Sequence, residues 1–347
     1  MSEATDKLLI WMLDDGIPGH WSMTDGLVRL IAAQRPVRAE RIAVRWRWGG
    51  ARQLFQRLER IGLSVPAALV KLAVALPSPP TGAAPRLIVS RGGGTLFLNA
   101  WLARRHHAAN VFIGTLRGMP TGLFRAVVLQ RDGFGDPPYF AMPLLPSRID
   151  PLQLPREVAD FPWRHGRPQD PIASLFLGGD GSGYRYATDD WLAIGRGMRR
   201  LYDSFGVRWC VTSSRRTPAE AEALIRAEVP ADALHETCWW QAGDRRPCIE
   251  AFLGATEYVF CTEDSMSMLE ECIASGRPVV SLGKPDITPS EAFGAFLERR
   301  QRAGRLRRVT IEDFAAALPY PVTHAWQPVP ANAMADSTGQ LLAILGL

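Results

Sequence analysis

Lysine is scarce in this sequence, and motifs that bind nucleic acid are missing. Among the 40 lysine and arginine residues, the only lysines are Lys7, Lys71 and Lys284. Such an arginine bias can follow from the base composition of a gene, and there is no zinc-finger pattern, RNP motif or long basic tract. We therefore predict no nucleic-acid partner. The formal net charge of +5 suits anionic small substrates or an anionic membrane surface instead.

Long apolar runs are also missing. None reaches the ~18–20 residues of a transmembrane helix. The first run, Leu8–Leu13, is shorter than the core of a signal peptide and follows the acids Glu3 and Asp6. We therefore predict a cytoplasmic protein. Apolar residues make up 47% and charged residues 22% of the 347 positions, which is typical of a globular chain long enough for two domains.

Signals for a bound metal are absent as well. The cysteines are odd in number and show no C-x-x-C spacing, which predicts buried thiols in a reducing compartment rather than zinc ligands: Cys210, Cys238, Cys248, Cys261 and Cys272. Aspartates occur as the adjacent pairs Asp14-Asp15 and Asp189-Asp190 and form no D-x-D motif. We therefore expect no metal and no cofactor.

What the sequence does contain is a regular alternation of short apolar segments and amphipathic segments, which predicts an α/β fold with parallel sheets. We predict strands at Leu8–Leu13, Ile42–Trp48, Arg86–Ser90, Val111–Gly114, Ala126–Leu129, Ile172–Leu177, Arg208–Ser213, Thr237–Trp240, Tyr258–Cys261 and Val279–Leu282. The predicted helices are Trp21–Gln34, Asp189–Phe205, Ala219–Val229, Pro247–Leu253, Ser265–Ser275, Glu291–Ala303 and Gln340–Leu347.

The pattern repeats on either side of a segment rich in proline and polar residues, Pro146–Pro171. This composition is typical of an interdomain linker. We therefore predict a Rossmann-like domain at 1–150, a linker at 151–170, a second Rossmann-like domain at 171–325 and a C-terminal segment at 326–347.

Three strands run into glycine-rich loops: "DDGIPGH" from Asp14, "SRGGGTL" from Ser90 and "LGGDGSGY" from Leu177. No G-K-[ST] follows, so none is a Walker motif. Glycine lets backbone amides approach a phosphate, although tight turns that need a positive φ explain the same residues. The candidates are Gly16, Gly19, Arg91, Gly92 and Gly93 in the first domain, and Gly179, Gly181, Ser182 and Gly183 in the second.

Two further loops of the second domain combine residues that suit a nucleotide diphosphate. In "TSSRRTP" a guanidinium fork matches two phosphate oxygens, although solvated arginines are the alternative; the candidates are Ser214, Arg215, Arg216 and Thr217. "TEDSMSMLEE" follows a strand and begins a helix, and there the alternative is a helix cap with solvated glutamates. Its candidates are Glu263, Asp264, Ser265, Met266, Ser267 and, for the ribose hydroxyls, Glu271.

A reaction that moves a proton needs a base within hydrogen-bond reach of the reacting group. His20 is our candidate in the first-domain loop, with Asp15 in reserve, and a helix-start histidine that faces water is the alternative. The segment Arg45–Pro77 combines arginines, tryptophans and apolar helix. It fits either an anionic membrane surface or a helix pair packed on the sheet.

These motifs resemble known families. Taken together, "TSSRRTP", "TEDSMSMLEECIASGRPVV" and "DDGIPGHWSMTDGL" resemble the mitochondrial fission family of plants and its bacterial homologues, in matching order over nearly the whole chain. Trp21-Ser22 stands where the family pattern has Asn-Gln. The run from Glu271 to Gly276 and Pro278 is similar to the donor-nucleotide helix of GT-B glycosyltransferases, including the N-acetylglucosaminyltransferase of peptidoglycan synthesis.

The resemblance implies a GT-B fold, with two Rossmann-like domains facing across a cleft and a C-terminal helix that packs back on the first domain. The first domain would bind the acceptor and the second a nucleotide sugar. The implied activity is metal-independent glycosyl transfer to an envelope or lipid-linked acceptor, with peripheral contact at the inner face of the membrane. A nucleotide-sugar hydrolase or epimerase, or a non-catalytic adaptor of the mitochondrial fission type, remains the alternative.

Overall fold

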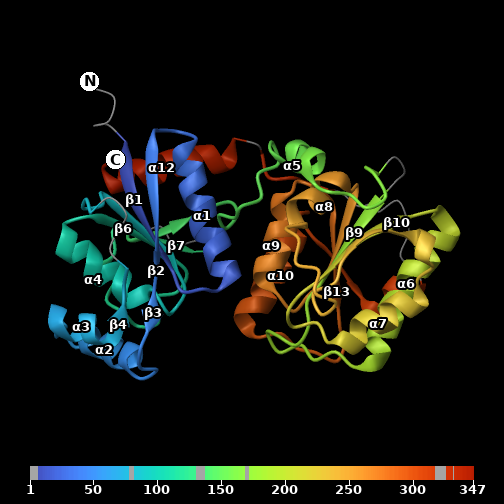
Figure 1. Cartoon of the computed structure of the whole chain (residues 1–347), viewed down its shortest axis with the longest axis horizontal. Helices are drawn as coiled ribbons and strands as arrows, with labels where there is room; N and C mark the ends of the chain where they lie inside the picture. The colour runs from blue at the N-terminus through green and yellow to red at the C-terminus, as the bar shows by residue number, and fades with distance from the viewer. Residues whose placement is uncertain (1–6, 78–81, 130–136, 169–171, 317–325, 331) are drawn as a thin grey trace. The chain divides into compact units, whose positions relative to one another are not determined.

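The computed structural model describes residues 7–77, 82–129, 137–168, 172–316, 326–330 and 332–347. The chain divides into two compact units (Figure 1). Unit 1 comprises Met1–Arg148 together with Pro330–Leu347, and unit 2 comprises Ile149–Val329. The predicted return of the C-terminal helix to the first domain is therefore confirmed.

Unit 1 is built on a six-stranded parallel sheet of order β2-β1-β5-β6-β7-β8. Its strands are β1 (Leu8–Asp14), β2 (Val37–Ala43), β5 (Leu87–Arg91), β6 (Ala109–Ile113), β7 (Ala126–Leu129) and β8 (Tyr139–Ala141). The central strands read as continuous apolar runs because helices cover both of their faces. A separate antiparallel pair joins β3 (Arg45–Trp46) to β4 (Val74–Ala75).

Alternate residues of β1 enter two different cores, as the period of a strand requires. Leu8, Ile10 and Met12 pack under α1 (Pro18–Ala32) and α12 (Ala333–Leu345). Trp11 and Leu13 face the opposite core. That core is shared with α2 (Ala51–Arg60), α3 (Ala67–Ala73) and α4 (Leu96–His106), which lie on the other side of the sheet in Figure 1.

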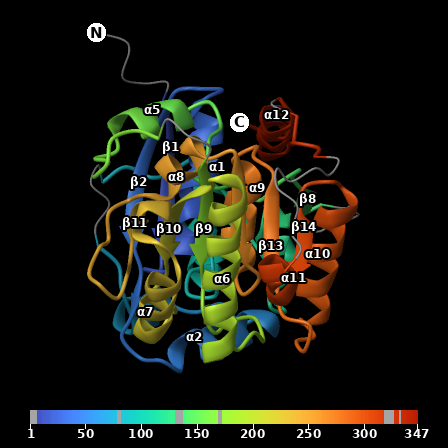
Figure 2. The same cartoon turned by 90° about the vertical axis from the view of Figure 1, so that its right-hand side faces the viewer.

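Unit 2 has a second parallel sheet, of order β11-β10-β9-β12-β13-β14. Its strands are β9 (Ile172–Leu177), β10 (Arg208–Ser213), β11 (Leu234–Cys238), β12 (Tyr258–Thr262), β13 (Val279–Gly283) and β14 (Arg307–Thr310). Its helices are α5 (Leu154–Asp160), α6 (Thr188–Phe205), α7 (Ala219–Glu228), α8 (Ile249–Ala255), α9 (Met266–Ala274), α10 (Glu291–Arg302) and α11 (Ile311–Ala316). Figure 2 shows α6 in front of the sheet.

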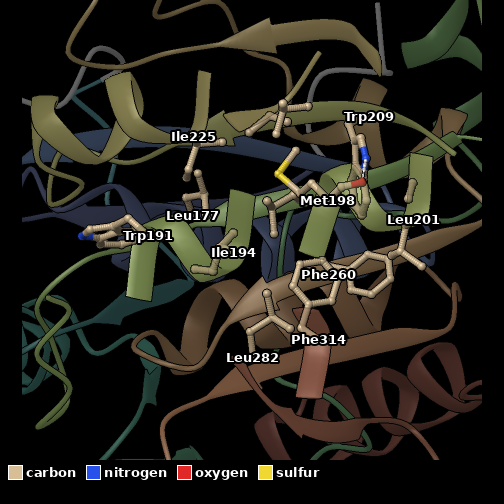
Figure 3. Close-up of a cluster of buried hydrophobic side chains, with 14 of the residues drawn as sticks. Leu177, Trp191, Ile194, Met198, Leu201, Trp209, Ile225, Phe260, Leu282 and Phe314 are labelled. Atoms are coloured by element: carbon tan, nitrogen blue, oxygen red, sulfur yellow. Dashed lines mark hydrogen bonds between the residues drawn. The ribbon is translucent and has the colours of Figure 1, made fainter. Parts of the chain in front are cut away.

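The core under α6 gathers around a fully buried tryptophan (Figure 3). Trp209 packs against Phe260 with 5.4 Å between ring centroids, and its indole N–H donates to the Met198 carbonyl at 3.2 Å. Gly197 lets α6 approach α11 closely, because a Cβ there would lie 2.5 Å from the ring of Phe314. All five cysteines are free and buried, which confirms their prediction as buried thiols. In the described part of the chain, no helix is both long and apolar enough to cross a membrane.

Most predicted elements are present, but some boundaries were wrong. Ile42–Trp48 is not one strand: β2 ends at Ala43, and only Arg45–Trp46 continue as β3. The strand predicted at Thr237–Trp240 starts earlier, at Leu234. Helix α1 begins at Pro18 instead of Trp21, because proline is favourable in the first helical turn.

The predicted linker, 151–170, contains ordered structure that belongs to unit 2. Helix α5 lies against α8 so closely that a Cβ on Gly254 would come within 2.8 Å of the Leu154 carbonyl oxygen. The segment after α5 is bonded to β11 and to the loop that follows it: the Arg164 backbone N–H donates to Glu236 at 2.7 Å, and the Arg164 guanidinium bonds Asp244. Arg246 bonds the same two carboxylates, at 2.8 and 3.0 Å.

The packing of α12 on unit 1 leads to a first prediction. Leu341 is fully buried in the unit 1 core, whereas Ile344 on the same helix is 37% exposed. Leu341→Ala should lower the free energy of unfolding by about 2–5 kcal/mol, because it leaves a cavity, and Ile344→Ala by at most about 1 kcal/mol. Urea denaturation followed by circular dichroism measures both, and equal losses would show that α12 does not bury Leu341.

A second prediction concerns the charged contacts of Asp244. Hydrogen bonds from Arg246 lower the pKa of this carboxyl from 3.8 to about 2. A depressed pKa stabilises the folded state above the unfolded value, and that stabilisation is lost as the pH falls from about 4 toward 2. Asp244→Asn should therefore cost about 1–2 kcal/mol at pH 7 and progressively less below pH 4.

The matched control is Asp203→Asn, which removes an exposed pair with Arg199. We expect it to change stability by less than about 0.5 kcal/mol. Urea midpoints for both variants and the wild type at several pH values test the sign. A loss for Asp244→Asn that is as large at pH 3 as at pH 7 would contradict the assignment.

Candidate functional site

The first candidate site lies in unit 2, at the edge where its parallel strands end. The loops after β9, β10 and β12 leave the sheet there, at residues 178–184, 214–217 and 263–265. Strand β9 pairs with both β10 and β12, so the three loops are neighbours. Ligands of open α/β sheets bind outside the carboxyl ends of the strands, and most of the predicted nucleotide residues lie in these loops.

Asp264 holds the three loops together. Its carboxylate is completely buried, accepts the Thr262 hydroxyl at 2.6 Å on Oδ1 and accepts Arg216 at 2.6 Å on Oδ2. Burial raises the pKa of this carboxyl, although the hydrogen bond from Thr262 and the charge of Arg216 act in the opposite direction. Asp264 therefore positions Arg216 and offers no surface to a ligand.

Glycine is needed where the first loop meets these two side chains. A Cβ on Gly178 would lie 2.0 Å from the Asp264 carboxylate, and one on Gly181 would lie 1.8 Å from the Arg216 guanidinium. A Cβ on Gly179 would lie 2.1 Å from the Arg216 carbonyl oxygen. The glycines of this loop thus permit a close approach of the loop to the Arg216–Asp264 pair.

Four amides of the same loop already have acceptors within the protein. Gly178 N–H donates to the Thr262 hydroxyl at 2.8 Å, and Gly179 N–H donates to Asp264. Gly181 and Tyr184 exchange backbone hydrogen bonds of 3.2 and 2.8 Å. They enclose Ser182 and Gly183, which have φ values of 50° and 93° in an exposed turn.

Glu263 is also buried and bonded within the protein. It accepts the Tyr184 hydroxyl at 2.8 Å and Ser281 at 2.5 Å, and it pairs with Arg308 at 2.8 Å. Burial, followed by the neighbouring charge of Glu263, raises the pKa of Tyr184. Like Asp264, this acid therefore holds the loop after β12 in place.

The start of α9 is the part of this segment that suits an anion. Ser265 is the residue before the helix, and its carbonyl accepts the first helical bond, from Leu269, at 3.1 Å. The preceding amides, of Met266, Ser267 and Met268, are those that a helix leaves for a cap or ligand. Within the described chain the Ser265 side chain makes no capping bond to them; its hydroxyl lies 3.3 Å from that of Ser267.

The loop after β10 brings Arg216 to this point. Thr217 is buried and anchors the loop, since its hydroxyl donates to the Leu177 carbonyl at 3.1 Å and accepts the Ser214 N–H at 2.9 Å. The Arg216 side chain retains 33% of its exposure, whereas Arg215 is exposed. On α9, Glu271 is partly buried, while its neighbour Glu270 is buried and paired with Arg300 at 2.7 Å.

A second cluster lies in unit 1, again at the carboxyl edge of the sheet. His20 Nδ1 lies 3.0 Å from both carboxylate oxygens of Asp15. His20 stands in the first turn of α1 rather than in the loop where the sequence placed it. The pair is enclosed by the loop after β5: a Cβ on Gly92 would lie 2.2 Å from His20 Nδ1 and 2.7 Å from Asp15 Oδ2.

The remaining residues predicted for unit 1 shape these two loops. Gly16 has a φ of 80°, and its N–H donates to Asp14 Oδ1 at 2.9 Å. Gly19 lies in the first turn of α1, and Arg91 ends β5. Gly93 is buried, and its carbonyl accepts the Gln56 side chain at 3.2 Å. The structure thus brings Asp15, His20 and Gly92 into contact.

The sequence pattern did not indicate several residues that complete the two clusters. In unit 2, Arg308 pairs with Glu263, and Lys284 bonds Asp190 at 2.7 Å. In unit 1, Arg41 bonds Asp14 at 2.9 Å, and its guanidinium lies 4.2 Å from the centre of the Trp21 ring. Each of these cations is far in sequence from its partner. No local signal indicates such pairs, because the tertiary fold decides which distant residues meet.

Comparison with protein families and solved structures places this geometry in context. The profile of a family described as Mitochondrial fission ELM1 matches residues 18–342. Among known proteins, the chain is 22% identical to the uncharacterized protein RP120 of Rickettsia prowazekii (strain Madrid E) over 115 residues, and the match spans 33% of this chain and 32% of that protein's length.

Similar solved structures extend over the whole chain. The UDP-GlcNAc 2-epimerase of Methanocaldococcus jannaschii matches at 11% identity with a TM-score of 0.59, over 98% of this chain and 99% of that one. The enzyme of Neisseria meningitidis, solved with UDP-GlcNAc, matches at 10% identity and TM-score 0.57 over the same shares. CalG4, the calicheamicin glycosyltransferase, matches at 12% and 0.51, over 98% and 94%. The chain has the predicted α/β GT-B fold.

The enclosure of His20 leads to a third prediction. Gly92 has a φ of 93°, so Gly92→Ala introduces both backbone strain and a clash with His20 Nδ1. We expect the free energy of unfolding to fall by about 1–3 kcal/mol and the His20–Asp15 contact to break. Urea denaturation measures the first effect. NMR of the histidine rings measures the second, with the His20 signal assigned through His20→Gln.

The control is Gly122→Ala in the same unit, where a Cβ would meet no atom within 4 Å and φ is ordinary. It should leave stability within about 0.5 kcal/mol of the wild type and leave the His20 signal in place. Equal stability and an unchanged His20 signal in Gly92→Ala would show that the loop after β5 does not enclose this histidine.

Proposed function

Because the chain belongs to the mitochondrial fission ELM1 family and has the GT-B fold, we propose that it binds a nucleotide-activated sugar and transfers the glycosyl group to an acceptor hydroxyl. The single observation that supports this most is the Arg216 guanidinium, fixed by the buried Asp264 beside the start of α9. A rigid cation and free helix amides at one sheet edge match the two phosphates of a sugar nucleotide.

The chemistry asked of these groups is electrostatic. As the bond between the anomeric carbon and the diphosphate oxygen breaks, its electron pair stays on the departing diphosphate. Arg216, with the exposed Arg215 and the amides of Met266 and Ser267, would stabilise that charge without a metal. Arg216 is held in advance by Asp264, so little reorganisation is needed as the charge develops. Glu271, further along α9, is our candidate for the ribose hydroxyls.

Unit 1 would supply the base. In the His20–Asp15 pair Asp15 orients the ring through Nδ1, which leaves Nε2 to take the proton of the acceptor hydroxyl. The acceptor oxygen then bonds the anomeric carbon as the diphosphate leaves. Asp15 acts through His20 in this scheme and is a positioning residue.

Epimerisation or hydrolysis of a nucleotide sugar is the second candidate. The similar structures from M. jannaschii and N. meningitidis are UDP-GlcNAc 2-epimerases, and the proposed diphosphate contacts would serve that chemistry equally well. Transfer to a lipid-linked acceptor would place the protein at the inner face of the membrane. A non-catalytic adaptor that has kept the site is the third hypothesis, and turnover separates it from the other two.

A fourth prediction tests the site directly. In a thermal-shift titration with UDP and UDP-GlcNAc as probes, a ligand at about 100 times its Kd should stabilise the wild type by about 2.7 kcal/mol. Arg216→Ala should weaken binding by about 2–3 kcal/mol, because a charge-assisted contact to phosphate is lost, and Glu271→Ala should weaken it by about 1 kcal/mol.

Arg199→Ala is the matched control, because it removes an exposed arginine of the same unit that pairs with Asp203 across one helical turn. It should bind as the wild type does. Failure of every nucleotide and nucleotide sugar to shift the wild type would reject the proposal. Binding that depends on Arg216 without hydrolysis, epimerisation or transfer in a product assay would instead identify an adaptor.

A further inference from the structure

Exposed apolar side chains are concentrated on one short stretch of unit 1. Eleven large hydrophobic residues are exposed in the described chain, and six of them lie within 25 positions, between 47% and 70% exposed. Scattered exposed apolar residues are ordinary, but a gathered set marks an interaction surface. The six, which we call the α2–α3 face, are Trp48, Leu54, Ile61, Leu63, Leu69 and Leu72.

The two helices turn apolar residues both inward and outward. In α3, Val70 and Ala73 enter the core, while Leu69 and Leu72, one turn apart, face away from it. In α2, Phe55 is buried and Leu54 is exposed. Figure 1 shows α2, α3 and the β3–β4 pair together at one end of unit 1.

The charges around this face are almost all of one sign. Between residues 45 and 77 the only acid is Glu59, which is buried and bonded to Arg104. Among the described residues, no carboxylate pairs with any of five cations of the stretch: Arg45, Arg47, Arg52, Arg57 and Lys71. An apolar face with unpaired cations complements a surface that is both apolar and anionic.

A hollow of about 890 Å³ is lined by residues of α3, β3 and β4. Apolar residues that include Val70, Val74 and Trp101 line it, together with Arg45, Arg47 and Lys71, and no carboxylate is among its described lining residues. Apolar space beside cations is the environment that the acyl region and phosphate of an anionic lipid would occupy.

We propose that the α2–α3 face docks on the surface of an anionic lipid bilayer. The apolar side chains enter the boundary between headgroups and acyl chains, and the cations lie at the level of the lipid phosphates. A second copy of the chain is a poorer occupant, because a two-fold contact would place the unpaired cations of both copies against one another.

The face is fixed to the loop that encloses His20. The Gln56 side chain of α2 donates to the Gly93 carbonyl at 3.2 Å, and Trp46 of β3 donates to the Gly94 carbonyl at 2.8 Å. Docking would therefore hold this loop close to the bilayer. The proposal goes beyond the nucleotide site of unit 2 and does not require it.

The test is co-sedimentation of the full chain with vesicles of neutral phosphatidylcholine and of phosphatidylcholine mixed with phosphatidylglycerol. We expect binding to the mixed vesicles that weakens with salt, and little binding to the neutral ones. Arg52→Gln with Arg57→Gln should lower the partition coefficient about fivefold per charge. Leu69→Gln with Leu72→Gln should lower it at least about tenfold.

The matched controls lie in unit 2: Leu152→Gln with Phe205→Gln, which are 80% and 50% exposed, and Arg199→Gln with Arg302→Gln, which are both exposed. They should bind as the wild type does, and all variants should keep its melting temperature. If the Leu69/Leu72 variant is destabilised, Leu63→Cys carrying a polarity-sensitive dye gives a second measurement, because the five native thiols are buried.

A blue shift of that dye with mixed vesicles and not with neutral ones supports docking. Equal sedimentation of the wild type, the face variants and the controls would overturn the proposal, as would no sedimentation of the wild type. A dimer that the Leu69/Leu72 variant dissolves, without vesicle binding, would overturn it in favour of a second copy. Nucleotide binding in the thermal-shift titration is measured without lipid, so the two proposals fail independently.

Discussion

The buried ion pair between Asp264 and Arg216 is the contact on which the unit 2 site depends. A carboxylate removed from water is tolerated only where its hydrogen bonds are satisfied, and here Thr262, Gly179 and Arg216 satisfy them. Gly179 and Arg216 lie on the loops after β9 and β10, Thr262 ends β12, and Asp264 itself lies on the loop after β12. Satisfying one buried charge therefore connects all three loops and holds the guanidinium beside Asp264, two residues before α9 begins.

The other acids of the same segment follow this pattern. Glu263 is bonded by Tyr184, Ser281 and Arg308, and Glu270 pairs with Arg300. The polar residues between β12 and α9 thus serve mainly to hold the loop in place. A ligand at this edge would contact the groups that remain accessible. Those groups are the Arg216 guanidinium and the first amides of α9, and the positive N-terminal end of this helix favours an anion.

The sequence predicted the sheets well and the roles of these acids poorly, and the reason is physical. Strands such as Ile172–Leu177 and Arg208–Ser213 coincide with apolar runs in the sequence. The local pattern alone therefore predicts where each strand begins and ends. Whether a glutamate such as Glu263 faces a ribose or the protein interior depends on Arg308, 45 positions away. Likewise α1 starts before His20 because of Pro18, and the edge strand β14 has too little apolar content to be recognised.

In each unit, an acid at the carboxyl edge of the sheet is bonded by an arginine, but the surroundings of the two arginines differ. In unit 1, Asp14 ends β1 and is bonded by Arg41, but Arg41 also lies over the ring of Trp21 and belongs to a neighbouring strand. That cation has two contacts, with Asp14 and with the Trp21 ring, although 58% of its side chain is exposed. In unit 2, Arg216 stands on a loop, and a third of its side chain remains exposed. Next to Asp14, the carboxylate of Asp15 pairs with His20. A partly exposed fixed guanidinium suits phosphate, and an acid–histidine pair suits proton transfer. The contact of Arg216 with Asp264 and the acid–histidine pair of unit 1 support our proposal that unit 2 binds the sugar nucleotide and that His20 accepts the acceptor's proton.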